Sequence, residues 1–255
     1  MKLPEHFTID DDGRCVIPDG ITEIGDSFFF NCDKLTTVVI PKGVTRIGNW
    51  AFCCCYGLTS VTIPDSVTEI GINAFCGCFE LASIYIPDSV IKIGRGAFSR
   101  CFHLTSVRIP DSITEFEDGI LDEKDKDREW YYDDDYEYDG CFSGCWWLTS
   151  IKLPKNLTKI GKNTFSDCDG LTSIEIPESV TEIGERAFAD CKNLTSVYIR
   201  TYDKSPENAK NALMISQHFD PATVSLKVPA GCADAYKHHA DFNGKFKEIL
   251  EVLEK

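Results

Sequence analysis

The sequence lacks the features that mark membrane proteins and nucleic-acid-binding proteins. No apolar run approaches the ~20 residues that a membrane-spanning helix needs, and no run of Lys and Arg could form a basic patch. The net charge is −15 at pH 7, and the opening stretch MKLPEHFTIDDDG has no apolar core of a signal peptide. We therefore expect no nucleic-acid partner, no membrane span and a cytoplasmic location. A surface or secreted location is the alternative if an export signal is missing from this chain.

The usual patterns of catalytic and metal-binding side chains are missing as well. The chain has five histidines, and none lies in the His-x-x-x-His spacing of a zinc site. It contains no phosphate-binding loop, dinucleotide fingerprint or nucleophile elbow. A serine recurs at one position of nearly every repeat described below, whereas a catalytic nucleophile is unique in its site. These observations predict a protein that is not an enzyme and has no cofactor or metal.

A repeat of 23 residues organises most of the chain. An Ile-Pro dipeptide, once Leu-Pro, ends at Pro18, Pro41, Pro64, Pro87, Pro110, Pro154 and Pro177. Successive prolines are 23 residues apart, except that one step is 44, which is one repeat plus 21 extra residues. The extra residues, 119–139, therefore form an insertion within one copy of the repeat.

The same residue types recur at fixed distances after each proline. An aliphatic residue lies at +3, Phe at +11, Cys at +14, Leu at +17 and Val or Ile at +20. The Leu-x-x-Val-x-Ile segment predicts a short strand ended by Pro, and the residues around +3 to +6 predict a second extended piece ended by Gly. Positions +8 to +14 are expected to form one or two helical turns. One unit cannot bury its own apolar face, so we predict an α+β solenoid of stacked coils with a parallel β-sheet and short helical turns.

The copies resemble the BspA-type leucine-rich repeat family, whose units look like LTSVTIPDSVTEIGINAFCGC, residues 58–78. The resemblance extends from residue 14 to residue 200. The stretch VSLKVPAGCADAYKHHADFNGKFKEI is similar to the closing segment of such proteins, with a strand, a helix and a final strand. The resemblance implies a right-handed solenoid and a role in adhesion or protein recognition. We expect a cap over 1–13, the solenoid over 14–200, and an irregular last coil and cap over 201–255.

Cysteine is the most distinctive residue of the repeat. Seven of the thirteen cysteines occupy the +14 position: Cys32, Cys55, Cys78, Cys101, Cys145, Cys168 and Cys191. A stacked column of thiols is linear, whereas zinc needs four converging ligands and a disulfide needs Cβ atoms turned toward each other. We predict a buried ladder of reduced thiols that can donate to turn carbonyls. Cys53, Cys54 and Cys76 lie at the variable +12 and +13 positions and are expected to be partly exposed and oxidisable.

The +15 position predicts an exposed aromatic stripe. Turns favour polar residues, and the outer copies have Asp33, Asp169 and Lys192 there. The middle copies instead have Tyr56, Phe79, Phe102 and Trp146, with Trp147 beside the last. Contiguous exposed aromatic side chains usually form an interface. The stripe is therefore the chief candidate for a binding surface.

Two other segments are candidates for binding. The outward strand position at +21 varies and includes Tyr85, Arg108 and Lys152, although a plain solvated sheet face is at least as good an interpretation. The insertion has ten acids and three bases, together with aromatic residues that include Trp130, Tyr131 and Tyr132. It is expected either to bind a basic partner or to fold back over the stripe. A loose match of residues 135–140, DYEYDG, to a calcium-binding loop lacks the glutamate required at position twelve.

Two classes of function remain open from the sequence. The first is a non-enzymatic leucine-rich repeat protein that recognises a protein partner, with adhesion as one form of this role. The second is a structural module that self-associates through the aromatic edge and the acidic insertion. Neither the partner nor the oligomeric state follows from the sequence.

Overall fold

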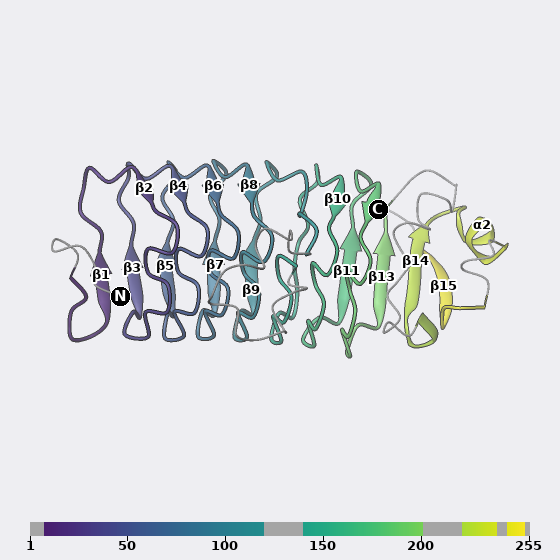
Figure 1. The fold of residues 1–255 in the computed structure, drawn as a ribbon. Coiled ribbons are helices and arrows are strands. Elements are labelled where there is room, and N and C mark those ends of the chain that lie inside the picture. Colours follow the sequence, from purple (N-terminus) through teal and green to yellow (C-terminus); the bar gives the residue numbers. More distant parts are fainter. Residues whose placement is uncertain (1–7, 120–139, 201–220, 239–243, 253–255) are drawn as a thin grey trace.

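The chain folds into an elongated solenoid whose coils stack side by side (Figure 1). The computed structural model describes residues 8–119, 140–200, 221–238 and 244–252. All strand ladders among these residues are parallel, and most paired residues are 23 positions apart, as Arg14 and Thr37 are. The period of the sequence is therefore the step from one coil to the next. The predicted parallel solenoid is confirmed.

One row of strands is formed by the Leu-x-x-Val-x-Ile segments. It contains β1 (Arg14–Val16), β3 (Thr37–Val39), β5 (Ser60–Thr62), β7 (Ser83–Tyr85), β9 (Ser106–Arg108), β11 (Ser173–Ile176) and β13 (Ser196–Ile199). In each strand the Val or Ile at +20, or Cys15 in β1, is buried. Its neighbours point outward or are partly covered, because successive side chains of a strand alternate between faces.

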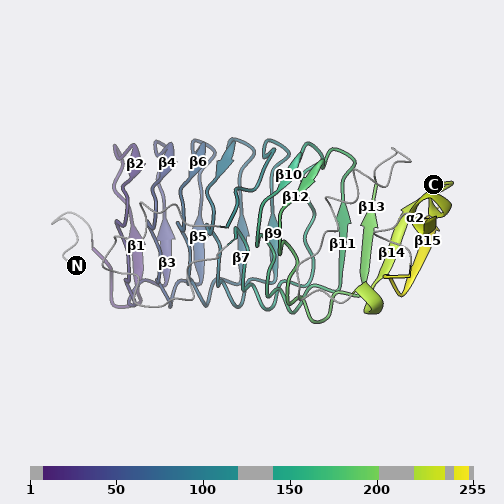
Figure 2. The same ribbon diagram turned by 45° about the vertical axis from the view of Figure 1, so that its right-hand side comes forward.

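A second row of two-residue strands lies on another side of the coils (Figure 2). It contains β2 (Glu23–Ile24), β4 (Arg46–Ile47), β6 (Glu69–Ile70), β8 (Lys92–Ile93), β10 (Lys159–Ile160) and β12 (Glu182–Ile183). The isoleucine at +6 faces the core in each strand. The residue before it lies at the surface or is partly covered, and it is charged in every strand of this row.

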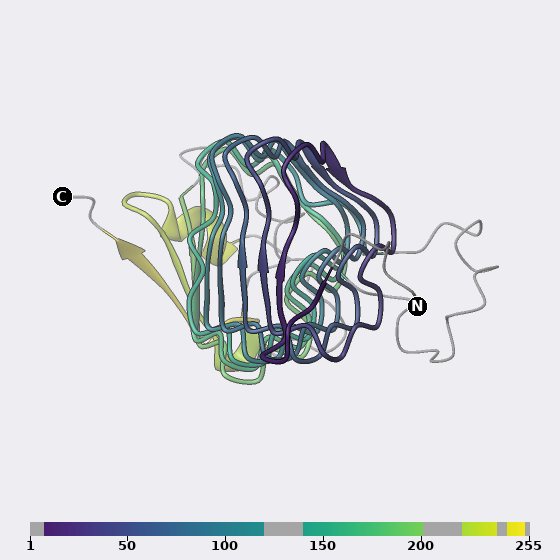
Figure 3. The same ribbon diagram turned by 90° about the vertical axis from the view of Figure 1, so that its left-hand side faces the viewer.

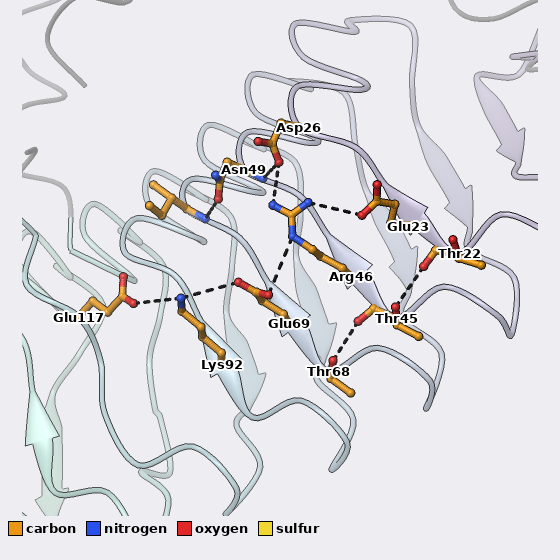
Figure 4. A network of polar contacts seen from close by, with 11 residues as sticks. Thr22, Glu23, Asp26, Thr45, Arg46, Asn49, Thr68, Glu69, Lys92 and Glu117 are labelled. Carbon is orange, nitrogen blue, oxygen red and sulfur yellow. Dashed lines mark hydrogen bonds and ion pairs between the residues drawn. The ribbon is translucent and has the colours of Figure 1, made fainter. Parts of the chain in front are cut away.

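The charges in this second row alternate in sign along the stack. The +5 residues are Glu23, Arg46, Glu69, Lys92, Glu115, Lys159 and Glu182. Figure 4 shows part of the resulting network, in which Arg46 lies 3.8 Å from Glu23 and 3.9 Å from Glu69, and Lys92 lies 3.7 Å from Glu69. Opposite charges on neighbouring parallel strands stabilise the in-register pairing, since a like pair in the same place would repel.

The third side of each coil is a chain of turns, and this corrects the expectation of short helical turns. In the coils without the insertion, two positions, +9 and +13, have positive φ, as at Asn73 (52°) and Gly77 (70°). A right-handed helix cannot continue through such residues. Backbone amides reach across to the next coil instead: the N–H of Phe29 donates to Ala51 at 2.7 Å and that of Phe52 to Ala74 at 2.8 Å.

The core contains a column of phenylalanine rings that runs along the stack of coils. Figure 3 shows the ribbon viewed from the end of the stack. The +11 rings are Phe29, Phe52, Phe75, Phe98, Phe142, Phe165 and Phe188. Neighbouring rings are nearly parallel, with centroids 5.1–5.6 Å apart. The column crosses the insertion without a break, since Phe98 stacks on Phe142 at 5.5 Å. The insertion therefore leaves the frame of the repeat intact.

The carboxyl-terminal segment continues the first row of strands. It contains η3 (Pro221–Thr223), β14 (Ser225–Pro229), α2 (Ala233–His238) and β15 (Glu248–Val252). The step from β13 to β14 is 29 residues instead of 23, since Ser196 pairs with Ser225. Tyr236 of α2 is fully buried. The expected order of strand, helix and strand is confirmed.

Candidate recognition surface

The +15 side chains form a continuous stack of rings, which we call the aromatic column: Tyr56, Phe79, Phe102 and Trp146. Ring centroids are 4.6 Å apart between Tyr56 and Phe79, 4.5 Å between Phe79 and Phe102, and 4.1 Å between Phe102 and Trp146. The interplanar angles are 27°, 19° and 14°. The stack forms because each ring follows directly after a ladder cysteine, whose burial fixes the same backbone position in every coil.

The aromatic column remains open to solvent along its edge. Tyr56 is 37% exposed and Trp146 is 48% exposed, while Phe79 and Phe102 are partly covered by their neighbours in the stack. Offset stacking hides the faces of the inner rings and leaves their edges accessible. Exposed apolar area of this kind is unfavourable in water by ~25 cal/mol per Å². A partner that covers it would therefore gain binding free energy.

A second line of side chains lies beside the aromatic column at the +16 position. The His103 Nδ1 lies 3.0 Å from a carboxylate oxygen of Glu80, and the His103 ring makes an edge-to-face contact with Trp147 at 5.2 Å. Trp147 is 59% exposed. Trp147 widens the apolar surface of the aromatic column, and Glu80 and His103 add polar groups at its border.

At each end of the aromatic column, the next residue at the +15 position is an aspartate. Asp33 precedes Tyr56 in the +15 series, and Asp169 follows Trp146. A carboxylate oxygen of Asp169 lies 2.9 Å from the ammonium group of Lys192. Burial, followed by the nearby Asp190, raises the pKa of Asp167, which lies close to this end. Negative charge therefore borders the apolar surface at both ends.

Six of the seven ladder cysteines, all except Cys32, are buried. From the second coil onward each thiol lies within hydrogen-bond distance of the +11 phenylalanine carbonyl of the preceding coil, as Cys78 does with Phe52 at 3.2 Å and Cys101 with Phe75 at 3.3 Å. The same contact is made by Cys55, Cys145, Cys168 and Cys191. Cys32 is only partly buried, which corrects the expectation of burial there, because no preceding coil covers it.

The expectation that Cys53, Cys54 and Cys76 are partly exposed is wrong. They form a small cluster with Trp50 and are 4%, 8% and 1% exposed. The Cys53 and Cys54 sulfurs lie 3.6 Å apart, and hydrogen bonding with Cys54 and then Cys76, with burial, raises the pKa of Cys53 far above its ordinary value. Thiols in this state are poor nucleophiles, because the thiolate is the reactive form.

This thiol cluster also borders the aromatic column. Burial and, after it, a hydrogen bond with Cys54 raise the pKa of Tyr56 to about 12. No group of three or more His, Cys, Asp or Glu side chains in the described part of the chain is arranged to hold a metal ion. The cluster therefore packs against Tyr56, the first ring of the aromatic column.

The variable strand position forms a separate surface on the first row of strands. Tyr85 is 55% exposed, and the Arg108 guanidinium lies 5.1 Å from the centre of its ring. Lys152 pairs with Arg108 through an isolated parallel bridge and borders a shallow depression of about 440 Å³ with Glu175 and Arg200. These residues come from the strand row and the aromatic column from the turn before it, so the two candidate surfaces are distinct.

Three candidate binding residues, Trp130, Tyr131 and Tyr132, lie outside the described residues. Residues 135–139, which belong to the stretch that loosely matches a calcium-binding loop, also lie outside them. The positive φ angles of the turns were not predicted from the sequence.

The residue types at the +9 and +13 positions indicate these angles, because Asn, Asp and Gly fill many of these positions and are the residues that most readily adopt positive φ.

The fold and this surface define a class of protein: a repeat solenoid that presents a regular side-chain array. No helix in the described ranges is long and apolar enough to cross a bilayer. The model of the BspA-type leucine-rich repeat region matches residues 13–126 and 138–214, so the chain belongs to that family.

Solved structures of leucine-rich repeat proteins share the fold. One from T. pallidum is 27% identical, with a TM-score of 0.56, and the match covers 71% of this chain and 78% of that one. A second, from Bacteroides ovatus, is 24% identical with a TM-score of 0.56 and covers 95% of this chain and 74% of that one. No curated protein matches the chain significantly.

Proposed function

We propose that this protein is a non-enzymatic recognition module that binds a protein partner through the aromatic column. The proposal rests on one observation: at the +15 turn position the middle coils have four stacked aromatic rings that are open along one edge, whereas the outer coils have polar residues there. Packing of the core does not require these rings, because the +11 phenylalanines already fill it. Clustered exposed aromatic side chains are typical of binding hot spots.

Membership of a leucine-rich repeat family supports the proposal, since such solenoids generally serve as binding scaffolds. Adhesion is one form that this role takes in the proposal. Thirteen cysteines without a disulfide fit a reducing compartment, and we propose a cytoplasmic location on that ground.

The test compares capture of partner proteins by three forms of the full chain. The wild type is compared with the double variant Phe79→Ser, Phe102→Ser and with the control Tyr85→Ser, which changes an exposed ring on the strand row. We expect proteins retained by the wild type and the control to be lost with the double variant, with affinity at least tenfold lower. Equal capture by all three forms, with circular dichroism showing that each is folded, would contradict the proposal.

Self-association is the competing function, and it predicts a different result. Light scattering at increasing concentration would then show a dimer of the wild type and a monomer of the double variant. A wild type that stays monomeric at high concentration excludes this alternative.

A further inference from the structure

Resting on the proposed function, we infer that the partner presents an extended, basic polypeptide segment to the aromatic column. The segment has apolar side chains over the rings and one basic side chain at each end, about seven residues apart. The inference combines the spacing of the coils with the placement of carboxylates at the two ends of the column.

The spacing follows from the repeat. Asp33 and Asp169 are the +15 residues on either side of the four rings, so five coil steps separate them. Neighbouring parallel strands lie ~4.8 Å apart, which places the two carboxylates about 24 Å from each other. An extended chain rises ~3.3 Å per residue. A segment laid along the column therefore needs about seven residues to pass from one acidic end to the other.

Carboxylates are in excess at the Trp146 end. Lys192 lies 2.9 Å from Asp169, but the other carboxylate oxygen of Asp169 is buried and receives no hydrogen bond from the described residues. Asp190 lies 3.3 Å from Arg186. Asp167 is a third carboxylate at this end, where burial, followed by the nearby Asp190, raises the pKa of its side chain. The acidic side chains named at this end, Asp167, Asp169 and Asp190, thus outnumber the named basic ones, Arg186 and Lys192.

The opposite end and the middle also carry negative charge. Asp33 is exposed, although the neighbouring Lys34 offsets part of its charge, so this end is the weaker of the two. Glu80 borders the centre of the column at the +16 position, within 3.0 Å of His103. The whole chain has a net charge of −15. A basic segment is attracted to this surface at long range as well as in contact.

The same charges argue against a second copy of this chain as the occupant. Two copies related by a two-fold axis would lay their columns together either in the same direction or in opposite directions. Each acidic end would then meet the acidic end of the other copy, and juxtaposed like charges oppose association. The pattern therefore selects a partner of opposite charge.

The experiment uses the intact chain and three fluorescently labelled ten-residue peptides. The first has lysines at its second and ninth positions with Leu, Val and Pro between them. The second has glutamates in place of the lysines, and the third has both lysines adjacent at one end. Fluorescence anisotropy at 20 and 300 mM NaCl measures the dissociation constants.

We expect the spaced-lysine peptide to bind at least tenfold more tightly than the glutamate peptide and at least threefold more tightly than the adjacent-lysine peptide. The variant Asp33→Asn, Asp169→Asn should weaken it about tenfold at low salt, whereas Asp65→Asn, an exposed acid away from the column, should leave it unchanged. High salt should reduce the difference between the lysine and glutamate peptides.

Equal or tighter binding of the glutamate peptide would overturn the inference about charge, and equal binding of the two lysine peptides would overturn the spacing. Absence of binding by all three peptides would overturn the inference as a whole. The proposed function would still stand if the Phe79→Ser, Phe102→Ser variant loses captured protein, and it would fail separately if that variant captures normally.

Discussion

At the scale of single residues, the close stacking of coils explains why small and apolar side chains recur. The +7 glycine lets neighbouring coils approach: a Cβ on Gly71 would lie 2.6 Å from the backbone nitrogen of Asn49, and a Cβ on Gly94 would lie 2.6 Å from that of Ile72. The corresponding Gly25 in the first coil has nothing within 4 Å, because no coil precedes it. The +7 glycine is thus required mainly because neighbouring coils pack closely there, and less because it ends a strand.

This contrast predicts different effects of alanine at two equivalent positions. Gly71→Ala should destabilise the protein by about 2–3 kcal/mol, because its methyl group overlaps backbone that cannot move without disturbing the stack. Gly25→Ala should have an effect within about 0.5 kcal/mol. Urea denaturation of both variants measures the difference. Equal losses of stability would show that the close approach of coils is not the reason for the glycine.

The buried thiols predict a loss of stability at alkaline pH. Burial raises the pKa of Cys78, Cys101, Cys145 and Cys168 well above 9, and that of Cys191 to about 12. Because the folded-state pKa exceeds the unfolded value, the thiols contribute full stability below pH 9. Above it the unfolded chain ionises first, so each thiol costs about 1.4 kcal/mol per pH unit until the folded pKa is reached.

Thermal unfolding in reductant should therefore show a Tm that falls steeply between pH 9 and pH 10.5. The triple variant Cys78→Ala, Cys101→Ala, Cys145→Ala should be less stable at pH 7 because of the cavities it creates. Its Tm should nevertheless fall less steeply over the same range. Parallel curves for the two proteins would count against the ladder as the source of the alkaline effect.

At the scale of the elements, register is specified by side chains that repeat in every coil. The two-residue strands β2, β4, β6 and β8 are too short to be selective through backbone hydrogen bonds alone, and their charges alternate in sign. A slip by one whole coil would place like charges opposite each other. The charged row therefore adds specificity to an apolar core whose coils are nearly interchangeable.

The charged row predicts the effect of reversing one sign. Arg46→Glu would place a third carboxylate between Glu23 and Glu69, and we expect a loss of about 1 kcal/mol at low salt, since Arg46 is partly exposed. The loss should shrink in 0.5 M NaCl. Lys42→Glu is the control, because Lys42 is exposed and forms no ion pair within the described residues. A similar loss for the control would attribute the effect to net charge alone.

At the scale of the whole molecule, the solenoid tolerates an insertion because each coil contacts mainly its neighbours. The coils on either side of residues 119–139 stack directly: the N–H of Phe98 donates to Cys141 at 2.9 Å, and the Phe116 ring contacts Phe142 edge to face at 5.7 Å. The backbone pairing and the core thus continue across the insertion. The inserted residues are not needed to complete either of them.

Replacing residues 120–139 by a four-residue Gly-Ser linker should leave a cooperatively folded protein. We expect a Tm within about 5 °C of the wild type, since loop length affects stability only slowly. A variant with twenty Gly and Ser residues in the same place controls for linker length. A broad, non-cooperative transition for both variants would mean that the insertion is part of the folding unit.

Much of the molecule was determined by the sequence itself, because in a solenoid a period along the chain becomes a column in space. The period of 23 places Phe75 between Phe52 and Phe98, Cys78 beside the Phe52 carbonyl, and Phe102 between Phe79 and Trp146. Each of these contacts follows from equivalent positions in adjacent coils. The parallel strands and the aromatic column could be predicted for the same reason.

Only the tertiary structure decided features that depend on where the next coil lies. The +8 to +14 segment looks helical in isolation, yet its amides bond to the adjacent coil and its backbone takes positive φ at Asn73 and Gly77. Cys53 and Cys76 look variable and exposed in sequence, but stacking buries them against Trp50. Cys32 occupies a core position and remains partly open because it is in the first coil. Hydrogen bonding and burial at these sites are set by contacts between coils, which the local sequence does not contain.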